Sequence, residues 1–222
     1  MKSLRLQATL SCALAACLPW AKVFAQSRAE LDTRWHVAGE VGGVIGGTWL
    51  SGLDVPTVAT GGGAQVAIRA TRTVSAGARA GAALRVGAQP LHLTENAVRW
   101  DGGTLADVQL VGTLSLGVTP VGALMSDIDF SAGVSTFSGA STIVPFRSAP
   151  RVAPSADVGI SVHRGRSSDE ANAEREPHPY ALFARYSAVR IDPGSPTTGE
   201  VGRTSASAGW ARRVTVGMRV QR

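Results

Sequence analysis

Apolar and polar residues alternate with a period of two along most of the chain, which is the pattern of β-strands that have one apolar face. The clearest run covers residues 106 to 118, where alternate positions are Ala, Val, Leu or Gly and most of the positions between them are polar. Residues 74 to 88 repeat the pattern with alanine, valine and leucine on one face. Helical periodicity with capping residues is not convincing anywhere, so the pattern predicts an all-β protein.

Eight such runs are predicted to be strands, and the links between them alternate in length. The predicted strands cover residues 35–49, 63–72, 74–89, 103–118, 121–136, 153–163, 179–190 and 204–221. Two links are short, at Thr73 and at Thr119 with Pro120. The longer links are 51–62, 90–102, 137–152 and 191–203, and residues 164–178 are also long where a short turn is due. Long links on one rim and short links on the other are typical of an eight-stranded antiparallel up-and-down transmembrane β-barrel.

The first 25 residues have the pattern of a secretory signal peptide. Lys2 and Arg5 give a basic start, and the apolar stretch over residues 6–19 is too short to span a bilayer. Small and branched residues then precede a predicted cleavage site before Gln26, which leaves a single domain of residues 26–222. In a second interpretation, Cys17 ends a lipobox and carries a lipid anchor.

Both cysteines and both lysines of the chain lie in this leader, which changes the composition of the predicted mature domain. Without cysteine, the domain has no disulfide scaffold, no thiolate metal site and no thiol nucleophile. It carries 19 arginines against 16 acidic residues, a formal net charge of +3. These charges are interspersed rather than clustered, so nucleic-acid binding is not expected.

The more polar face of the strands carries glycine, serine, alanine, aspartate and arginine, rather than the lysine, glutamate and threonine usual on a water-facing sheet. Such residues suit a narrow lumen. An isolated buried charge is costly, so both signs in one lumen imply hydrogen-bonded ion pairs, for which the forked guanidinium is well suited. The predicted lumen network comprises Glu40, Arg69, Arg79, Arg85, Asp107, Asp127, Asp129, Asp157, Arg185, Arg213 and Arg219.

Aromatic residues on the apolar face are candidates for the membrane interfaces, where amphipathic rings are favoured. The predicted interface aromatics are Trp35, Trp49, Tyr180, Tyr186 and Trp210. Arg212 shares the face of Trp210, and a cation at mid-membrane costs roughly 2–4 kcal/mol, so Arg212 is predicted to lie near a rim. The lipid-facing residues of the last strand are then Val214, Val216, Met218 and Val220.

Taken together, the cleavable signal, the cysteine-free body, the eight alternating runs and the unequal links resemble the small eight-stranded outer-membrane barrels, the OmpA and OmpX-like group. The resemblance covers nearly all of residues 35–221 and is one of pattern rather than motif. The chain ends at Arg222, where members of that group usually end in an aromatic residue. The resemblance implies a porin-like envelope protein of a Gram-negative-type bacterium. Its implied partners are outer-membrane lipids, the barrel assembly machinery during biogenesis, and an extracellular ligand contacted through the loops.

Candidate chemistry in the sequence is sparse. Asp127 and Asp129 share a face and could hold a hard cation, but the nearby arginines favour ion pairing. The glycine pairs at 42–43 and 46–47 lack the lysine and the helix of a phosphate loop, so they are interpreted as positions that ease sheet bending. The four histidines do not have zinc-ligand spacing, so neither a metal nor a cofactor is predicted; they are His36, His92, His163 and His178.

Three functions remain open at this point. The leading one is a non-enzymatic outer-membrane barrel with a structural or surface-interaction role. The second is a soluble periplasmic or lipid-anchored barrel that binds an apolar ligand, which requires Leu110, Leu114, Ile128 and Val158 to point inward. The third is a lipid-modifying enzyme using Ser161 and His163, for which the sequence supplies neither an orienting acid nor an oxyanion hole.

Overall fold

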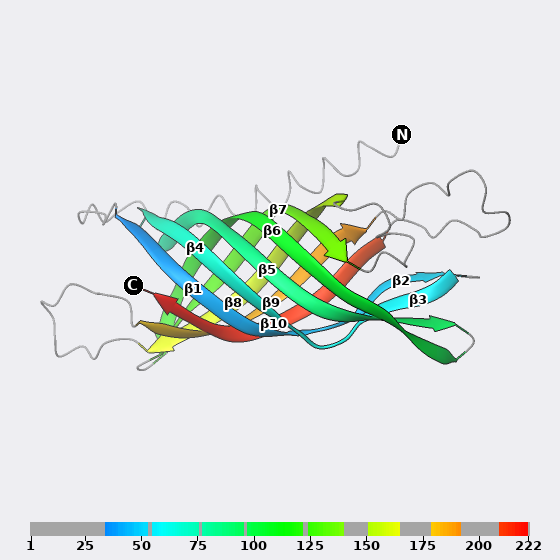
Figure 1. Cartoon of the computed structure of the whole chain (residues 1–222). Coiled ribbons are helices and arrows are strands. Elements are labelled where there is room, and N and C mark those ends of the chain that lie inside the picture. Colours follow the sequence, from blue (N-terminus) through cyan, green and yellow to red (C-terminus); the bar gives the residue numbers. More distant parts are fainter. Residues whose placement is uncertain are drawn as a thin grey trace, which may run out of the picture.

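The computed structural model describes residues 34–52, 55–75, 77–95, 97–121, 124–139, 151–164, 179–191 and 209–221 (Figure 1). The strands are β1 (Trp35–Ile45), β2 (Thr48–Gly52), β3 (Val55–Thr60), β4 (Gly63–Ser75), β5 (Ala78–Glu95), β6 (Val98–Val121), β7 (Leu124–Gly139), β8 (Arg151–Arg164), β9 (Tyr180–Ile191) and β10 (Gly209–Gln221). Within these ranges, no helix is long and apolar enough to cross a membrane. The predicted signal peptide, its cleavage site and Cys17 lie outside the described residues.

Eight of the ten strands close into a ring of antiparallel pairs, in the order β1, β10, β9, β8, β7, β6, β5, β4 and back to β1. The ends of the described chain meet in this ring, because β1 pairs with β10, with Val41 opposite Met218. Closure leaves no open edge in the barrel, so each backbone polar group can pair with a neighbouring strand. The predicted all-β fold, an eight-stranded antiparallel up-and-down barrel, is confirmed.

A short hairpin, β2 with β3, was not anticipated from the alternation pattern. The first predicted strand ends at Ile45 rather than at residue 49, and the predicted link over 51–62 contains most of the hairpin. The break falls at Gly46, where a Cβ atom would lie 1.9 Å from the Thr60 backbone oxygen. Only glycine allows the chain to leave the barrel at that point.

The predicted link over residues 90–102 is also corrected, because β5 and β6 continue through it as a hairpin with Glu95 opposite Val98. The predicted link starts at Pro90, but Pro90 lies where β5 changes neighbours, between its last pairing with β4 at Ala88 and its first with β3 at Leu91. Its missing N–H therefore interrupts no ladder on that side. The hairpin extends beyond the barrel beside β2 and β3 (Figure 1).

The links define two rims. At the short-link rim, β4 ends at Ser75 before β5 begins at Ala78, and β6 ends at Val121 before β7 begins at Leu124. These turns come two or more residues after the predicted positions. The start of β1 and the end of β10 lie at the same rim (Figure 1). The opposite, long-link rim carries the two hairpins, the end of β7, the start of β8, the end of β9 and the start of β10. The predicted exception at 164–178 lies almost wholly outside the described residues.

Glycines on the inner side of the strands let neighbouring backbones approach closely. A Cβ atom at Gly133 would lie 2.1 Å from the Leu110 oxygen, and one at Gly217 would lie 2.1 Å from the Val41 oxygen. Similar contacts occur at Gly42 and Gly47, in agreement with the expected role in bending, whereas a Cβ at Gly43 would meet nothing within 4 Å. Small residues at these points allow the strong curvature that a narrow barrel needs.

Candidate functional site

The two faces of the barrel wall are opposite in character to those of a water-soluble protein. Side chains that point outward include Leu110, which is 58% exposed, and Val158, which is 45% exposed. Charged side chains fill the inside, and Glu40 and Arg219 are only 5% and 2% exposed. The soluble, apolar-ligand reading required Leu110, Leu114, Ile128 and Val158 to line the interior. All four are exposed on the outside, so this requirement is contradicted.

A central group of five charged side chains lies in the half of the lumen nearer the short-link rim. Glu40 accepts hydrogen bonds from Arg185 at 2.5 Å and from Arg219 at 2.8 Å, and it lies 3.9 Å from Arg69. Asp129 accepts from Arg69 at 3.0 Å and from Arg219 at 2.9 Å. Two carboxylates are thus shared by three guanidinium groups. The group carries one excess positive charge.

Further polar contacts orient the guanidinium groups of this central group. The Ser115 hydroxyl lies between Arg69, which donates to it, and Asp129, which accepts from it. The Phe183 ring centroid lies 4.9 Å from the Arg185 guanidinium carbon, a distance at which cation and ring attract each other. These contacts satisfy groups whose burial would otherwise be costly.

Two separate ion pairs lie nearer the long-link rim, and both join strands that are not neighbours. Arg213 on β10 donates two hydrogen bonds to Asp107 on β6, at 2.9 and 2.7 Å. These two strands lie directly opposite each other in the order of the ring. Arg85 on β5 donates to Asp157 on β8 at 2.6 Å. Because these partners are far apart along the ring, each pair ties opposite sides of the barrel together.

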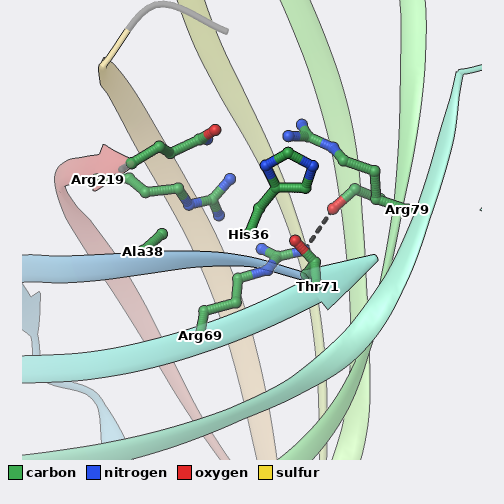
Figure 2. Close-up of a pocket in the computed structure, with 8 residues that line it drawn as sticks. His36, Ala38, Arg69, Thr71, Arg79 and Arg219 are labelled. Atoms are coloured by element: carbon green, nitrogen blue, oxygen red, sulfur yellow. Dashed lines mark hydrogen bonds between the residues drawn. The ribbon is translucent and has the colours of Figure 1, made fainter. Parts of the chain in front are cut away.

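The mouth of the lumen at the short-link rim contains the most exposed ion pair of the predicted set, between Arg79 and Asp127 at 2.7 Å. Figure 2 shows the guanidinium groups of Arg69, Arg79 and Arg219 around His36 in a small cavity at this end. The cavity volume is about 10 Å³, roughly enough for one water molecule. The cavity is therefore too small to hold a solute of metabolite size.

An apolar cluster closes the lumen at the long-link rim, and sequence reasoning missed it. We call it the apolar seal; its members are Val58, Leu91, Leu105, Phe137, Ala153, Val189 and Ala211. A signal was present, because on several strands the inward face changes from polar to apolar two residues beyond the last polar position, as from Asp107 to Leu105 and from Ser135 to Phe137. The seal lies inside the barrel next to the ion pairs, toward the long-link rim.

The eleven residues of the predicted lumen network all point to the interior, and each one contacts an oppositely charged member of the set. Asp127 and Asp129 were also considered as a cation site. In the structure these two carboxylates accept hydrogen bonds from different arginines. Asp127 accepts from Arg79, and Asp129 accepts from Arg69 and Arg219. The spacing of two along β7 places them on one face, as expected.

The candidate enzyme residues lie inside the barrel. The Ser161 hydroxyl is fully buried and accepts a hydrogen bond from Arg219 at 3.3 Å. The His163 Nδ1 atom lies 3.9 Å from an Asp127 oxygen. A nucleophile on a lipid-modifying enzyme must reach its substrate, whereas this hydroxyl faces a filled lumen.

The predicted interface aromatics point outward where the structure describes them. Trp35 lies opposite Arg72 near the short-link rim, and Trp210 lies opposite Arg190 near the long-link rim. Tyr180 begins β9, whereas Tyr186 lies in mid-strand. The Trp49 side chain lies outside the described residues.

Other outward-facing residues complete this picture of the exterior. Trp100 and Phe130 are further exposed aromatics that sequence reasoning did not select. Arg212 is exposed near the start of β10, close to a rim as predicted. Of the expected lipid-facing residues on the same strand, Val216, Met218 and Val220 are exposed, and Val214 is partly buried.

The fold and its interior define a closed eight-stranded antiparallel barrel with an apolar exterior and a charged, filled lumen. No family model matches the chain, and no curated protein matches it. Among solved structures, it is similar to the crystal structure of the outer membrane protein OprG from Pseudomonas aeruginosa. That match has a TM-score of 0.47 and 8% sequence identity, and it covers 86% of this chain and 97% of the other.

Proposed function

We propose that this protein is a non-enzymatic outer-membrane β-barrel whose lumen is held closed by ion pairs and whose long-link rim serves contacts at the cell surface. It reaches the membrane after export with a cleaved signal peptide. Its role is structural or in surface interaction, rather than transport through the lumen. Outer-membrane lipids and the barrel assembly machinery are its partners.

The observation that carries the proposal is the ring of exposed aliphatic side chains. Every strand of the barrel contributes to it, with Val37, Ile68, Leu84, Leu110, Val134, Ile160, Leu182 and Val216 as examples. Soluble monomers rarely expose so continuous an apolar surface. In a bilayer the same surface is in its preferred solvent, and the closed ring leaves no backbone group unsatisfied.

The height of this apolar surface agrees with a bilayer. Outward apolar residues on β1 extend from Val37 to Ile45. At a rise of about 3.3 Å per residue, this stretch is roughly 26 Å long. With the usual strand tilt of about 40°, it covers about 20 Å of the barrel axis, near the ~25 Å apolar band of outer-membrane barrels.

The buried side chains of the described strands support the surface role. The apolar seal and the ion-paired network lie inside the barrel, so a solute crossing the lumen would have to displace both. Within the described part of the chain, the β2–β3 hairpin and the β5–β6 hairpin extend beyond the barrel, and they lie side by side at the long-link rim. Binding functions commonly reside in such projecting segments of a rigid scaffold.

Fractionation of expressing cells tests the proposal. We expect the protein in the outer-membrane fraction, with a band in gel electrophoresis that shifts on heating as the barrel unfolds. Planar bilayers containing the purified barrel should show no stepwise conductance. Release of the protein by osmotic shock would refute the membrane assignment, and steady single-channel currents would refute the closed lumen.

A further inference from the structure

We propose that a groove on the outer surface of the barrel, at the short-link rim, binds one glycerophospholipid. One acyl chain lies in the groove, and the headgroup phosphate is held by Arg164. The inference rests on the proposed membrane-spanning function and adds a specific lipid site to it. The lining residues used in the argument are Leu124, Val162, Arg164, Tyr180, Leu182 and Met218.

The groove arises from the sizes of neighbouring side chains across three strand pairings. Val162 on β8 lies opposite Leu182 on β9 and opposite Ser126 on β7, so a small, partly buried side chain forms the floor. Leu124 and Leu182 are both more than half exposed and stand on either side of it. The volume of this open groove is about 240 Å³.

An apolar groove on a surface that faces lipid is filled by hydrocarbon, because water gains no hydrogen bonds there. A cavity of about 150 Å³ lined by apolar side chains holds a benzene molecule, so the larger volume here accommodates a stretch of acyl chain. Met218 on β10 continues the apolar lining beyond β9.

Polar groups stand at the rim end of the groove, where a headgroup would lie. Arg164 is the last residue of β8, lies opposite Leu124 and is exposed. No carboxylate of the described residues lies within 4 Å of its guanidinium group. Tyr180 is the first residue of β9 and is also exposed, with a ring suited to the interface. A guanidinium group binds phosphate through two parallel hydrogen bonds, so the charge and position of Arg164 favour a phospholipid over an uncharged one.

Photo-crosslinking of the folded, full-length mature barrel in vesicles tests the site. The vesicles are phosphatidylcholine with a trace of phosphatidylglycerol that carries a diazirine on one acyl chain, and labelled peptides are mapped by mass spectrometry. We expect labelling to concentrate on the groove strands, around residues 162 and 182. Even labelling around the whole outer surface would refute the site while leaving the membrane barrel intact. No labelling of outward-facing residues would instead refute the proposed membrane function.

Two matched pairs of variants make the test specific. Val162→Phe fills the groove floor and should abolish the preferential labelling of the groove. Val158→Phe, on the same strand and face, should leave that preferential labelling unchanged. Arg164→Gln should reduce groove labelling roughly fivefold, because one basic residue contributes about this factor to the affinity for an anionic lipid. Arg72→Gln, at the same rim on β4, should leave groove labelling unchanged. Unchanged labelling in Val162→Phe, or equal effects of the two arginine variants, would overturn the proposal.

Discussion

The bidentate pair between Asp107 and Arg213 offers a quantitative test of how the filled lumen stabilises the barrel. Both side chains are almost completely buried, and each oxygen of the carboxylate accepts a hydrogen bond. Replacing either residue alone leaves an uncompensated buried charge. We expect Asp107→Leu and Arg213→Met each to lower the free energy of unfolding by about 3–5 kcal/mol.

The double variant should behave differently from the sum of the two single variants. The next inward residues on the same strands are Leu105 and Ala211, which belong to the apolar seal. Leucine and methionine at positions 107 and 213 would therefore extend an apolar region that already exists. Replacement of a whole buried pair by apolar residues is often neutral or stabilising, so the coupling energy should be at least about 3 kcal/mol.

The measurement is urea unfolding of the barrel refolded into phosphatidylcholine vesicles, followed by tryptophan fluorescence and by gel mobility, with linear extrapolation to zero urea. The matched control is the rim pair, Asp127→Leu with Arg79→Met, whose side chains are less buried, at 10% and 21% exposed. Its coupling should be smaller than that of the buried pair, because water at the mouth screens the rim pair more strongly. Additive losses for Asp107 and Arg213, or single losses below about 1 kcal/mol, would refute the reasoning.

Three other substitutions test the wall of the barrel and one turn. Leu110→Arg places a cation on the outward face in the middle of β6 and should cost roughly 2–4 kcal/mol in a bilayer, whereas a cost within about 0.5 kcal/mol would indicate a water-facing position. Gly133→Ala should destabilise the barrel by about 1–3 kcal/mol, because its Cβ would lie 2.1 Å from the Leu110 oxygen. The control in the same urea titration is Gly43→Ala, which should be neutral because its Cβ would meet nothing within 4 Å. Ala97 has a φ of 64°, so Ala97→Gly should stabilise the barrel by about 1–2 kcal/mol, and a lower urea midpoint for this variant would contradict that expectation.

Much of the barrel wall could be predicted from the sequence because a strand has a side-chain period of two. The alternation around Leu110 and Asp107 requires one face to be apolar and the other polar, whatever the partners of the strand are. The same parity assigned Glu40, Arg85 and Arg213 to the polar face, which the structure places in the interior. Ion pairing could be anticipated from energetics alone, since lone charges are too costly to bury.

Local sequence was a poorer guide to the ends of the strands. Pro90 is the first residue of the predicted link over 90–102, yet it lies inside β5 at the position where the strand changes partners. Whether a missing N–H is harmful depends on the neighbouring strand, and a one-dimensional pattern does not contain that neighbour. For the same reason the alternation pattern did not separate β2 from β1, because the break at Gly46 depends on a contact with Thr60.

The sequence by itself determined the fold class and which residues share a face of each strand, because both follow from a backbone repeat of two. The structure decided that the charged face points into the lumen and the apolar face outward. The tertiary structure decided which carboxylate pairs with which guanidinium group, as in Arg213 of β10 with Asp107 of β6. It also decided that apolar residues of seven strands converge into the seal. Both depend on how the strands are staggered when the ring closes. Stagger is a property of the whole barrel, so no single strand encodes it.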